Sequence, residues 1–247
     1  MSAISGDWGV SGTVLLAAAP TSLCEGRFSD YVTGVDTQEK IEIYQDYRNA
    51  ARDYLSHVVT EIDNYSRNIK RIGKLLGLYR ENTLHFEDER ESLALIDFIL
   101  SERLFGGKSK IEQELDSGRV KDEKLIKILI GYKKSTTSLY EVTRTDKATS
   151  TVYLHDVLGD GGDTSILDIQ FSDSAQEGVL LFLRLVSVDE IRMTSGSAFV
   201  FDSNHRDLLL RRYRYLSKTS YAINPSVTRF IVFFKLNRKY GLPLELI

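Results

Sequence analysis

The chain has 247 residues, of which 42% are hydrophobic and 27% are charged, and its formal net charge is −3. These values are typical of a globular protein, and they exclude a disordered chain, a collagen and a small disulfide scaffold. The single cysteine, Cys24, has no partner for an internal disulfide, which predicts a reducing, cytoplasmic location. No apolar run reaches about 18 residues, so we expect neither a membrane-spanning helix nor a membrane partner.

The first 35 residues predict an extended N-terminal segment. They are rich in Gly, Ser and Thr and contain one apolar run, Val10–Ala19. A secretory signal peptide combines such a run with a basic start, whereas residues 1–9 contain Asp7 and no Lys or Arg. We therefore expect this segment to form a packed strand or loop.

Residues 36–134 predict a helical region. Asp36 and Glu39 have the spacing of a capping box, in which each side chain satisfies a free amide of the first turn. Apolar residues then recur at spacings of three and four from Tyr44 to Leu76, which predicts one amphipathic helix of about 40 residues and about 60 Å. Further helices are expected at Glu87–Leu104, Ser109–Leu115 and Asp122–Tyr132.

Four tyrosines lie on one face of the long predicted helix. Tyrosine buries a large area while its hydroxyl still needs water or a partner, so it is favoured at protein interfaces. Two interpretations remain open, namely an interface for self-association and a seam packed against the predicted helix Glu87–Leu104. The candidate interface residues are Tyr44, Tyr47, Tyr54 and Tyr65.

Residues 135–202 predict a small all-β module. The hydrophobic period changes from 3.6 to 2 near Ser138, and turn residues separate five apolar segments. Short antiparallel strands of this kind suit a barrel-like module, in which Val179–Val188, apolar on both faces, is expected to be the central strand. The expected strands are Leu139–Thr145, Thr151–Val157, Ser165–Phe171, Val179–Val188 and Ile191–Phe201.

Residues 203–247 predict two basic helices. They contain nine Lys and Arg and two acidic residues, whereas residues 138–201 contain ten acidic and four basic residues. This asymmetry indicates an acidic partner, or contact with the chain's own acidic half. The first helix is expected from Asp202 or Ser203 to Leu216. The second, Ser226–Tyr240, follows the helix-start pair Asn224-Pro225, although its Phe-rich centre would also suit a strand.

Basic and aromatic residues of the first C-terminal helix form a candidate nucleic-acid-binding site. Arginine side chains can neutralise phosphates, and tyrosine rings can stack on exposed bases. The alternative is a helix whose Leu208–Leu210 side packs inward while its arginines are solvated or pair with the acidic strands. The candidate residues are Arg206, Arg211, Arg212, Arg214, Lys218, Tyr213 and Tyr215.

The sequence shows no motif for catalysis or for a metal. The four histidines lack zinc-site spacing, and the run Gly159–Asp163 lacks the spacing of a calcium loop and predicts a hairpin turn. We therefore expect no catalytic residue, no metal and no cofactor. Asp156, Asp163 and Asp168 would form a magnesium site only if three loops brought them together, which leaves a hydrolase or nuclease as a minor alternative.

The sequence thus predicts an α+β protein with a helical N-terminal half, a small antiparallel β-barrel-like module and basic C-terminal helices. The leading functional hypothesis is a non-enzymatic adaptor or regulatory subunit that binds a protein partner or a second copy of itself. The alternative is a nucleic-acid-binding protein that uses the basic C-terminal helices. Neither hypothesis rests on a catalytic arrangement, because none is visible in the sequence.

Overall fold

The computed structural model describes residues 37–60, 67–159, 162–219 and 224–242. The expected N-terminal segment, Cys24, Asp36 and Tyr65 lie outside these ranges. Helices and antiparallel sheets make up the described part, which confirms the α+β class. One compact unit spans Val35–Ile247. The predicted boundaries after residues 134 and 202 coincide with changes of secondary structure, and as domain boundaries all three predicted positions remain a prediction.

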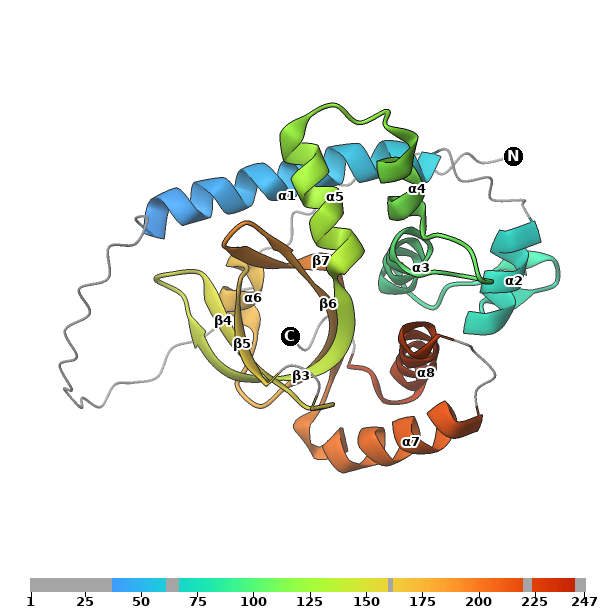
Figure 1. Ribbon diagram of the computed structural model, residues 1–247. Coiled ribbons are helices and arrows are strands. Elements are labelled where there is room, and N and C mark those ends of the chain that lie inside the picture. Colours follow the sequence, from blue (N-terminus) through green and yellow to red (C-terminus); the bar gives the residue numbers. More distant parts are fainter. Residues whose placement is uncertain (1–36, 61–66, 160–161, 220–223, 243–247) are drawn as a thin grey trace. The chain divides into compact units, whose positions relative to one another are not determined.

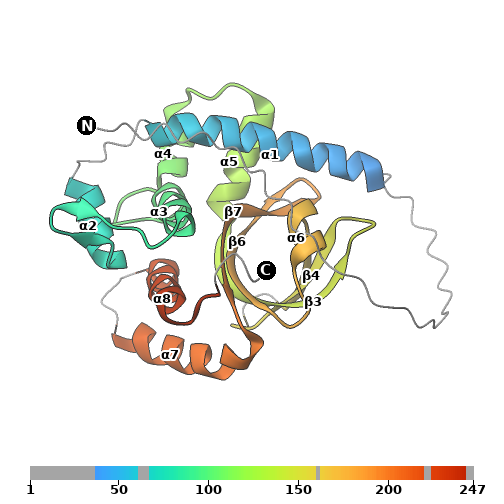
Figure 2. The same ribbon diagram turned by 180° about the vertical axis from the view of Figure 1, so that it is seen from behind.

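Figure 1 shows the arrangement of the described elements, and Figure 2 shows it from behind. The helices are α1 (Thr37–Thr60), α2 (Arg67–Leu76), α3 (Glu89–Ser101), α4 (Lys110–Ser117), α5 (Glu123–Lys134), α6 (Ile169–Ser174), α7 (Arg206–Thr219) and α8 (Pro225–Tyr240). The strands are β1 (Tyr79–Arg80), β2 (Thr83–Leu84), β3 (Thr136–Asp146), β4 (Thr151–Asp156), β5 (Asp163–Leu167), β6 (Leu180–Val188) and β7 (Ile191–Phe201). A 3-10 turn, Ser203–His205, leads into α7.

Two separate helices, α1 and α2, stand where the apolar spacing predicts one long helix. Helix α1 has 24 residues and α2 has 10, and residues 61–66 between them lie outside the described part. The buried side of α1 packs with α5, β6 and β7, whereas that of α2 packs with α3 and α8. The same spacing of three and four runs through both segments because each buries one face, although against different neighbours.

Side-chain caps begin the next three helices. Asp88, Ser109 and Asp122 accept hydrogen bonds from amides in the first turns of α3, α4 and α5, respectively. Ser109 and Glu112 form a complete capping box, and Gly118 ends α4 in the left-handed conformation with φ 62°. The three predicted helices are therefore confirmed, with ends shifted by a few residues.

The main sheet has five antiparallel strands in the order β5-β4-β3-β6-β7. The central strand is therefore β3, and the prediction that Val179–Val188 is central is wrong. Strand β6 is nevertheless apolar on both faces, because Phe182 points toward α8 while Leu181 and Leu183 lie in the cluster inside the curved sheet. A strand next to the centre is thus buried as completely as a central one when both faces of the sheet are covered.

The sheet curls so that its two edge strands approach each other (Figure 1). The side chain of Arg192 on β7 hydrogen-bonds that of Thr164 on β5. Within the described strands no backbone ladder joins these two edges, so the sheet is not a closed barrel. Helix α6, which Asp168 caps at a place where a strand is expected, contributes Phe171 to the apolar interior.

The final described helix, α8, lies against the outer face of the sheet. Its rings pack on those of the sheet, with 4.5 Å between the centroids of Phe182 and Phe233. Asn224 caps the helix and Pro225 occupies its first position, which confirms the predicted helix rather than a strand. Helices α2, α3 and α7 also contact α8, while Lys235 and Lys239 stay exposed. The helix therefore combines a phenylalanine-rich buried side with an exposed basic side.

Candidate functional site

Helix α7 buries one side and leaves the other open to solvent. Leu209 is fully buried, and the ring centroid of Tyr213 lies 5.4 Å from that of Phe233 in α8. These two side chains share a face because they are four residues apart. Of the three leucines expected to pack inward, Leu209 is buried and the other two, Leu208 and Leu210, are half-buried.

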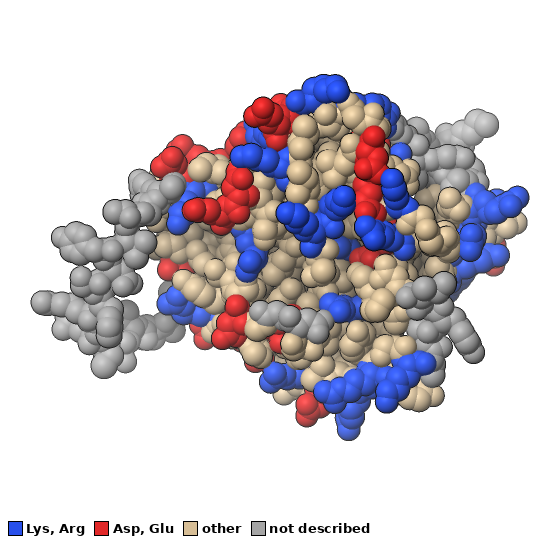
Figure 3. Space-filling view, viewed as in Figure 1, with Lys and Arg blue, Asp and Glu red and all other residues tan. Residues whose placement is uncertain are grey.

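The open side of α7 combines cationic and apolar groups. Leu208, Arg211, Arg212 and Tyr215 line a surface hollow of about 330 Å³, and Tyr215 is 64% exposed. Two residues turn a helix by about 200°, so Tyr215 faces outward although Tyr213 packs inward. Figure 3 shows Lys and Arg side chains gathered over α7.

Ion pairs neutralise only one of the five cations of α7 within the described part of the chain. Arg206 lies 3.5 Å from the carboxylate of Glu141 on β3. Arg211, Arg212, Arg214 and Lys218 are exposed, and none of them pairs with a carboxylate that the structure describes. The alternative of pairing with the acidic strands therefore applies to Arg206, while the other four cations remain available to an anion.

A second set of cations, on α2, was not recognised as a candidate site from the sequence. Ile69, Ile72 and Leu76 bury one side of this helix, and Arg67, Lys70, Arg71 and Lys74 are exposed on the other. The signal was available, because the 14 residues of the segment 67–80 include five Lys and Arg and no acidic residue. The same segment also continues the apolar spacing of the preceding residues, which favours the interpretation as part of one long helix.

The candidate interface tyrosines of α1 make contacts within the chain. Tyr44 is buried, and burial raises the pKa of its hydroxyl. The hydroxyl of Tyr47 donates to Asp189 at 2.6 Å, and this hydrogen bond raises the pKa of Tyr47 to about 12. The hydroxyl of Tyr54 donates to Glu114 at 3.0 Å. Their partners belong to α4 and to the turn between β6 and β7, so these contacts account for the tyrosine seam without a second molecule.

The three acids of the magnesium alternative have separate partners. Asp156 accepts a hydrogen bond from Ser138 at 2.6 Å, and Asp163 lies 2.6 Å from a ring nitrogen of His155. Asp168 caps α6 and pairs with Arg48 of α1 at 3.2 Å. Among the residues that the structure describes, no three His, Cys, Asp or Glu side chains converge to hold a metal ion.

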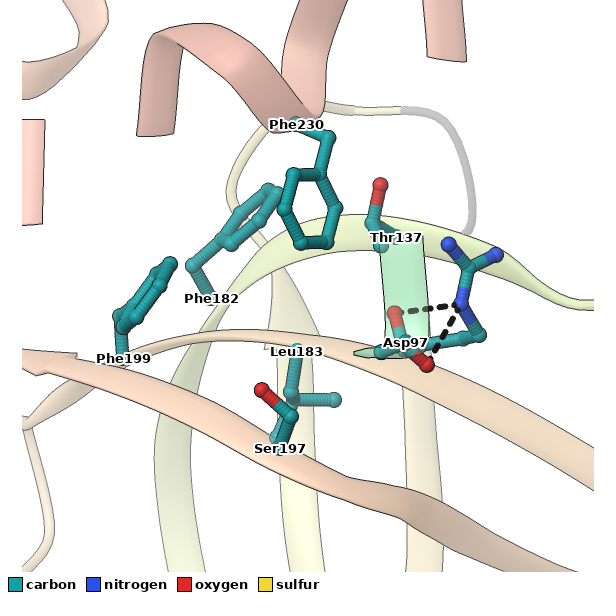
Figure 4. A pocket seen from close by; sticks show the side chains of 8 residues that line it. Asp97, Thr137, Phe182, Leu183, Ser197, Phe199 and Phe230 are labelled. Atoms are coloured by element: carbon teal, nitrogen blue, oxygen red, sulfur yellow. Dashed lines mark hydrogen bonds and ion pairs between the residues drawn. The ribbon is translucent and has the colours of Figure 1, made fainter. Parts of the chain in front are cut away.

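A buried ionic group lies between the sheet and the helices. Arg184 of β6 is 2% exposed and pairs with Asp97 at 3.0 Å and with Glu102 at 2.6 Å. Burial opposes the charge of Arg184, but the two carboxylates outweigh it and hold its pKa above the usual value. The adjoining pocket, shown in Figure 4, has a volume of about 10 Å³. That is room for about one water molecule, so the group supports the fold and is too enclosed to bind an organic substrate.

The described part of the chain is thus an α+β protein with a buried ionic group and an outward basic helix, four of whose five cations form no ion pair with a described carboxylate. The chain belongs to a family of unknown function, DUF7986, whose model matches residues 38–247. Comparison with curated proteins gives no significant match, and neither does comparison with solved structures. None of the helices in the described ranges combines the length and the apolar character needed to cross a bilayer.

Proposed function

We propose that this protein is a non-enzymatic binding protein whose ligand is a nucleic acid, held on the outward face of α7. The observation that supports the proposal is the group Arg211, Arg212, Arg214 and Lys218, exposed and without a carboxylate partner in the described part of the chain. Phosphates release counterions when such cations bind them, which supplies most of the affinity in sequence-independent binding. Tyr215, 64% exposed beside two of the arginines, supplies a surface on which a base can stack.

The second candidate is the adaptor or regulatory subunit. Its support is the apolar centre of the same face, where Leu208 and Tyr215 lie two turns apart between arginines. Arginine and tyrosine are the residues that most often dominate the energy of protein interfaces. In this case the partner is a protein segment that carries carboxylates around an apolar side chain, and self-association through α1 stays a separate prediction.

The barrel-like character of the β module forms part of this proposal. The apolar cluster inside the curl and the contact between Arg192 and Thr164 support it. A sheet that is nearly closed on itself is a rigid base for the helices packed on its outer face. We propose a cytoplasmic location as well, in line with the single cysteine of the sequence.

A titration of fluorescence anisotropy tests the nucleic-acid function. The probe is a labelled oligo(dT) of about 20 nucleotides, long enough for the site sizes of about 4 to 16 nucleotides seen in single-strand binders. We expect binding at low salt that weakens steeply between about 50 and 200 mM salt. The variant Arg211→Glu/Arg212→Glu/Arg214→Glu should abolish it.

A matched control keeps the change in charge and moves it elsewhere. Lys121, Lys134 and Lys147 are exposed and lie on other elements, so Lys121→Glu/Lys134→Glu/Lys147→Glu has the same net charge as the α7 variant. Retained binding by this control, together with loss in the α7 variant, assigns the site to α7. Absence of oligo(dT) binding at low salt, combined with binding of a poly-Glu peptide, would instead favour the second candidate.

A further inference from the structure

We propose that the binding surface continues from α7 across α8 to α2, and that one single strand of nucleic acid contacts all three helices. This inference rests on the proposed function of α7. It adds α2, which the sequence did not indicate as a site, and it gives α8, the second basic C-terminal helix, the role of joining α2 to α7. It identifies the ligand as single-stranded and predicts the shortest length that occupies the whole surface.

The first argument is the distribution of charge. Helices α2, α7 and α8 together contain thirteen Lys and Arg and one acidic residue, Asp207, although the whole chain is net acidic at −3. Three of the thirteen bind a carboxylate or a backbone oxygen in the described part: Arg206 pairs with Glu141, Arg229 donates to a backbone oxygen, and Arg238 pairs with Glu91. The other ten are exposed and form no ion pair with a described carboxylate: Arg67, Lys70, Arg71, Lys74, Arg211, Arg212, Arg214, Lys218, Lys235 and Lys239.

The second argument is continuity, which α8 provides. On one side of α8, Arg238 donates to the carbonyl oxygen of Gly77, just after α2, at 3.0 Å. On the other side, the ring centroid of Tyr240 lies 5.5 Å from that of His205, just before α7. At about 100° per residue, Lys235 and Lys239 fall between these two contacts on the helix surface.

The pictures agree with this order. Figures 1 and 2 both place α8 between α2 and α7. In Figure 3, Lys and Arg side chains gather over α2 as well as over α7. Helix α8, on which Lys235 and Lys239 are exposed, thus lies between two basic helices that are far apart in the sequence.

The third argument concerns the kind of strand. Each end of the surface carries an exposed aromatic ring beside an arginine: Tyr215 on α7, which is 64% exposed, and Phe105 near α2, which is 44% exposed. The guanidinium of Arg71 lies 3.6 Å from the centroid of the Phe105 ring. A single strand can place unpaired bases on such rings, whereas a duplex keeps its bases stacked inside.

The width of the surface sets the length of the ligand. Packed helices are about 8 to 10 Å apart, so the axes of α2 and α7, on either side of α8, are about 16 to 20 Å apart. A stacked strand advances about 3.4 Å per nucleotide, so about six nucleotides are needed to reach from α7 to α2. A shorter strand can occupy α7 alone.

The decisive experiment compares two ligand lengths and a variant confined to α2. Labelled oligo(dT) of about 4 and about 20 nucleotides is titrated by anisotropy into the wild-type protein and into Arg67→Gln/Lys70→Gln/Lys74→Gln. We expect the variant to bind the longer strand at least about tenfold more weakly, with a salt slope lower by about 2 because three phosphate contacts are lost. Its affinity for the shorter strand should be unchanged.

The controls separate the two proposals. The variant Lys121→Gln/Lys134→Gln/Lys147→Gln removes the same charge from other elements, and it should match the wild type for both strands. An α2 variant that binds the longer strand as well as the wild type does would overturn the extension while leaving the role of α7 intact. Wild-type protein that binds neither strand would remove the proposed function itself. Tighter binding of a duplex of the same length would refute the single-strand assignment.

Discussion

Replacing Arg184 with Met is expected to be one of the most destabilising changes on the buried side of β6 that faces the helices. The guanidinium is 2% exposed and holds Asp97 at 3.0 Å and Glu102 at 2.6 Å. The two carboxylates are themselves 7% and 3% exposed. Without the arginine they are left as two like charges inside the protein, with little water to solvate them.

The expected loss in the free energy of unfolding follows from the burial of these two carboxylates. Removing one partner of a buried ion pair costs about 3 to 5 kcal/mol, because the remaining charge is uncompensated. For a chain of this size each kcal/mol lowers the melting temperature by about 2 to 4 °C, so we expect a decrease of about 6 to 20 °C. The hydrogen bond from Ser226 to Glu102, at 2.9 Å, offsets a small part of this loss.

Urea unfolding followed by far-ultraviolet circular dichroism measures the effect as a change in the midpoint at constant slope. Lys124→Met is the control, since it breaks an ion pair with Asp46 in which both side chains are solvent-exposed. It should leave the midpoint close to that of the wild type. The triple variant Arg184→Met/Asp97→Leu/Glu102→Met replaces the whole group with apolar side chains and should recover most of the stability.

Two results would refute this reasoning. The first is a loss below about 1 kcal/mol for Arg184→Met, which would mean that water reaches the carboxylates. The second is a triple variant no more stable than the single one, which would mean that Arg184 acts through its packing volume and not through its charge.

Three further predictions concern titration and close packing. The hydrogen bond to Asp189 raises the pKa of Tyr47 to about 12. The contribution of this hydrogen bond to the free energy of unfolding should therefore be complete below pH 10.0 and disappear as the pH rises toward 12. The free energies of unfolding of the wild type and Tyr47→Phe should converge over that range. The hydrogen bond from Arg103 lowers the pKa of Glu112 from 4.5 to about 2. The contribution of this pair to the free energy of unfolding should therefore be complete above pH 4.5 and disappear as the pH falls toward 2. Acid unfolding of Glu112→Gln should lack this pH dependence. Gly131→Ala would place a Cβ 2.5 Å from a backbone oxygen of β6, and thermal unfolding should show a loss of about 1 to 3 kcal/mol; equal stability would contradict the close packing of α5 on β6.

The basic surface shows how far prediction from the sequence can reach at a site. Charge and composition identified α7, and of the Leu208–Leu210 side that was expected to pack inward, Leu209 is fully buried. Tyr213 was a candidate for the outward site, whereas its ring packs against Phe233. The partner of Arg206 could not be predicted, because Glu141 lies 65 positions earlier and on another element. The second basic helix, which contains Lys235, was part of the nucleic-acid-binding alternative, but its position next to α2 could not be predicted, because α2 lies more than 140 positions earlier.

The helices of the N-terminal half show a different limit. A spacing of three and four continues from Tyr44 to Leu76, yet it reports only that each turn buries one side. Two helices that bury their faces in different clusters leave the same pattern as one long helix. The tyrosines illustrate the same ambiguity. The pattern shows that this face of the helix is buried, but it does not show which residues pack on it. Asp189, the partner of Tyr47, is 142 positions away in the sequence.

The sequence by itself determined the local features of this protein: the helices α3 to α5, the five main strands, the start of α8 and the segregation of positive charge toward the C-terminus. These depend on caps, periodicity and composition within a few neighbouring residues. Only the tertiary structure decided which strand is central, what covers the tyrosines of α1, and that α2, α7 and α8 lie side by side. Such outcomes depend on contacts between residues distant along the chain, whose energies arise from burial and complementary charge and leave no local pattern.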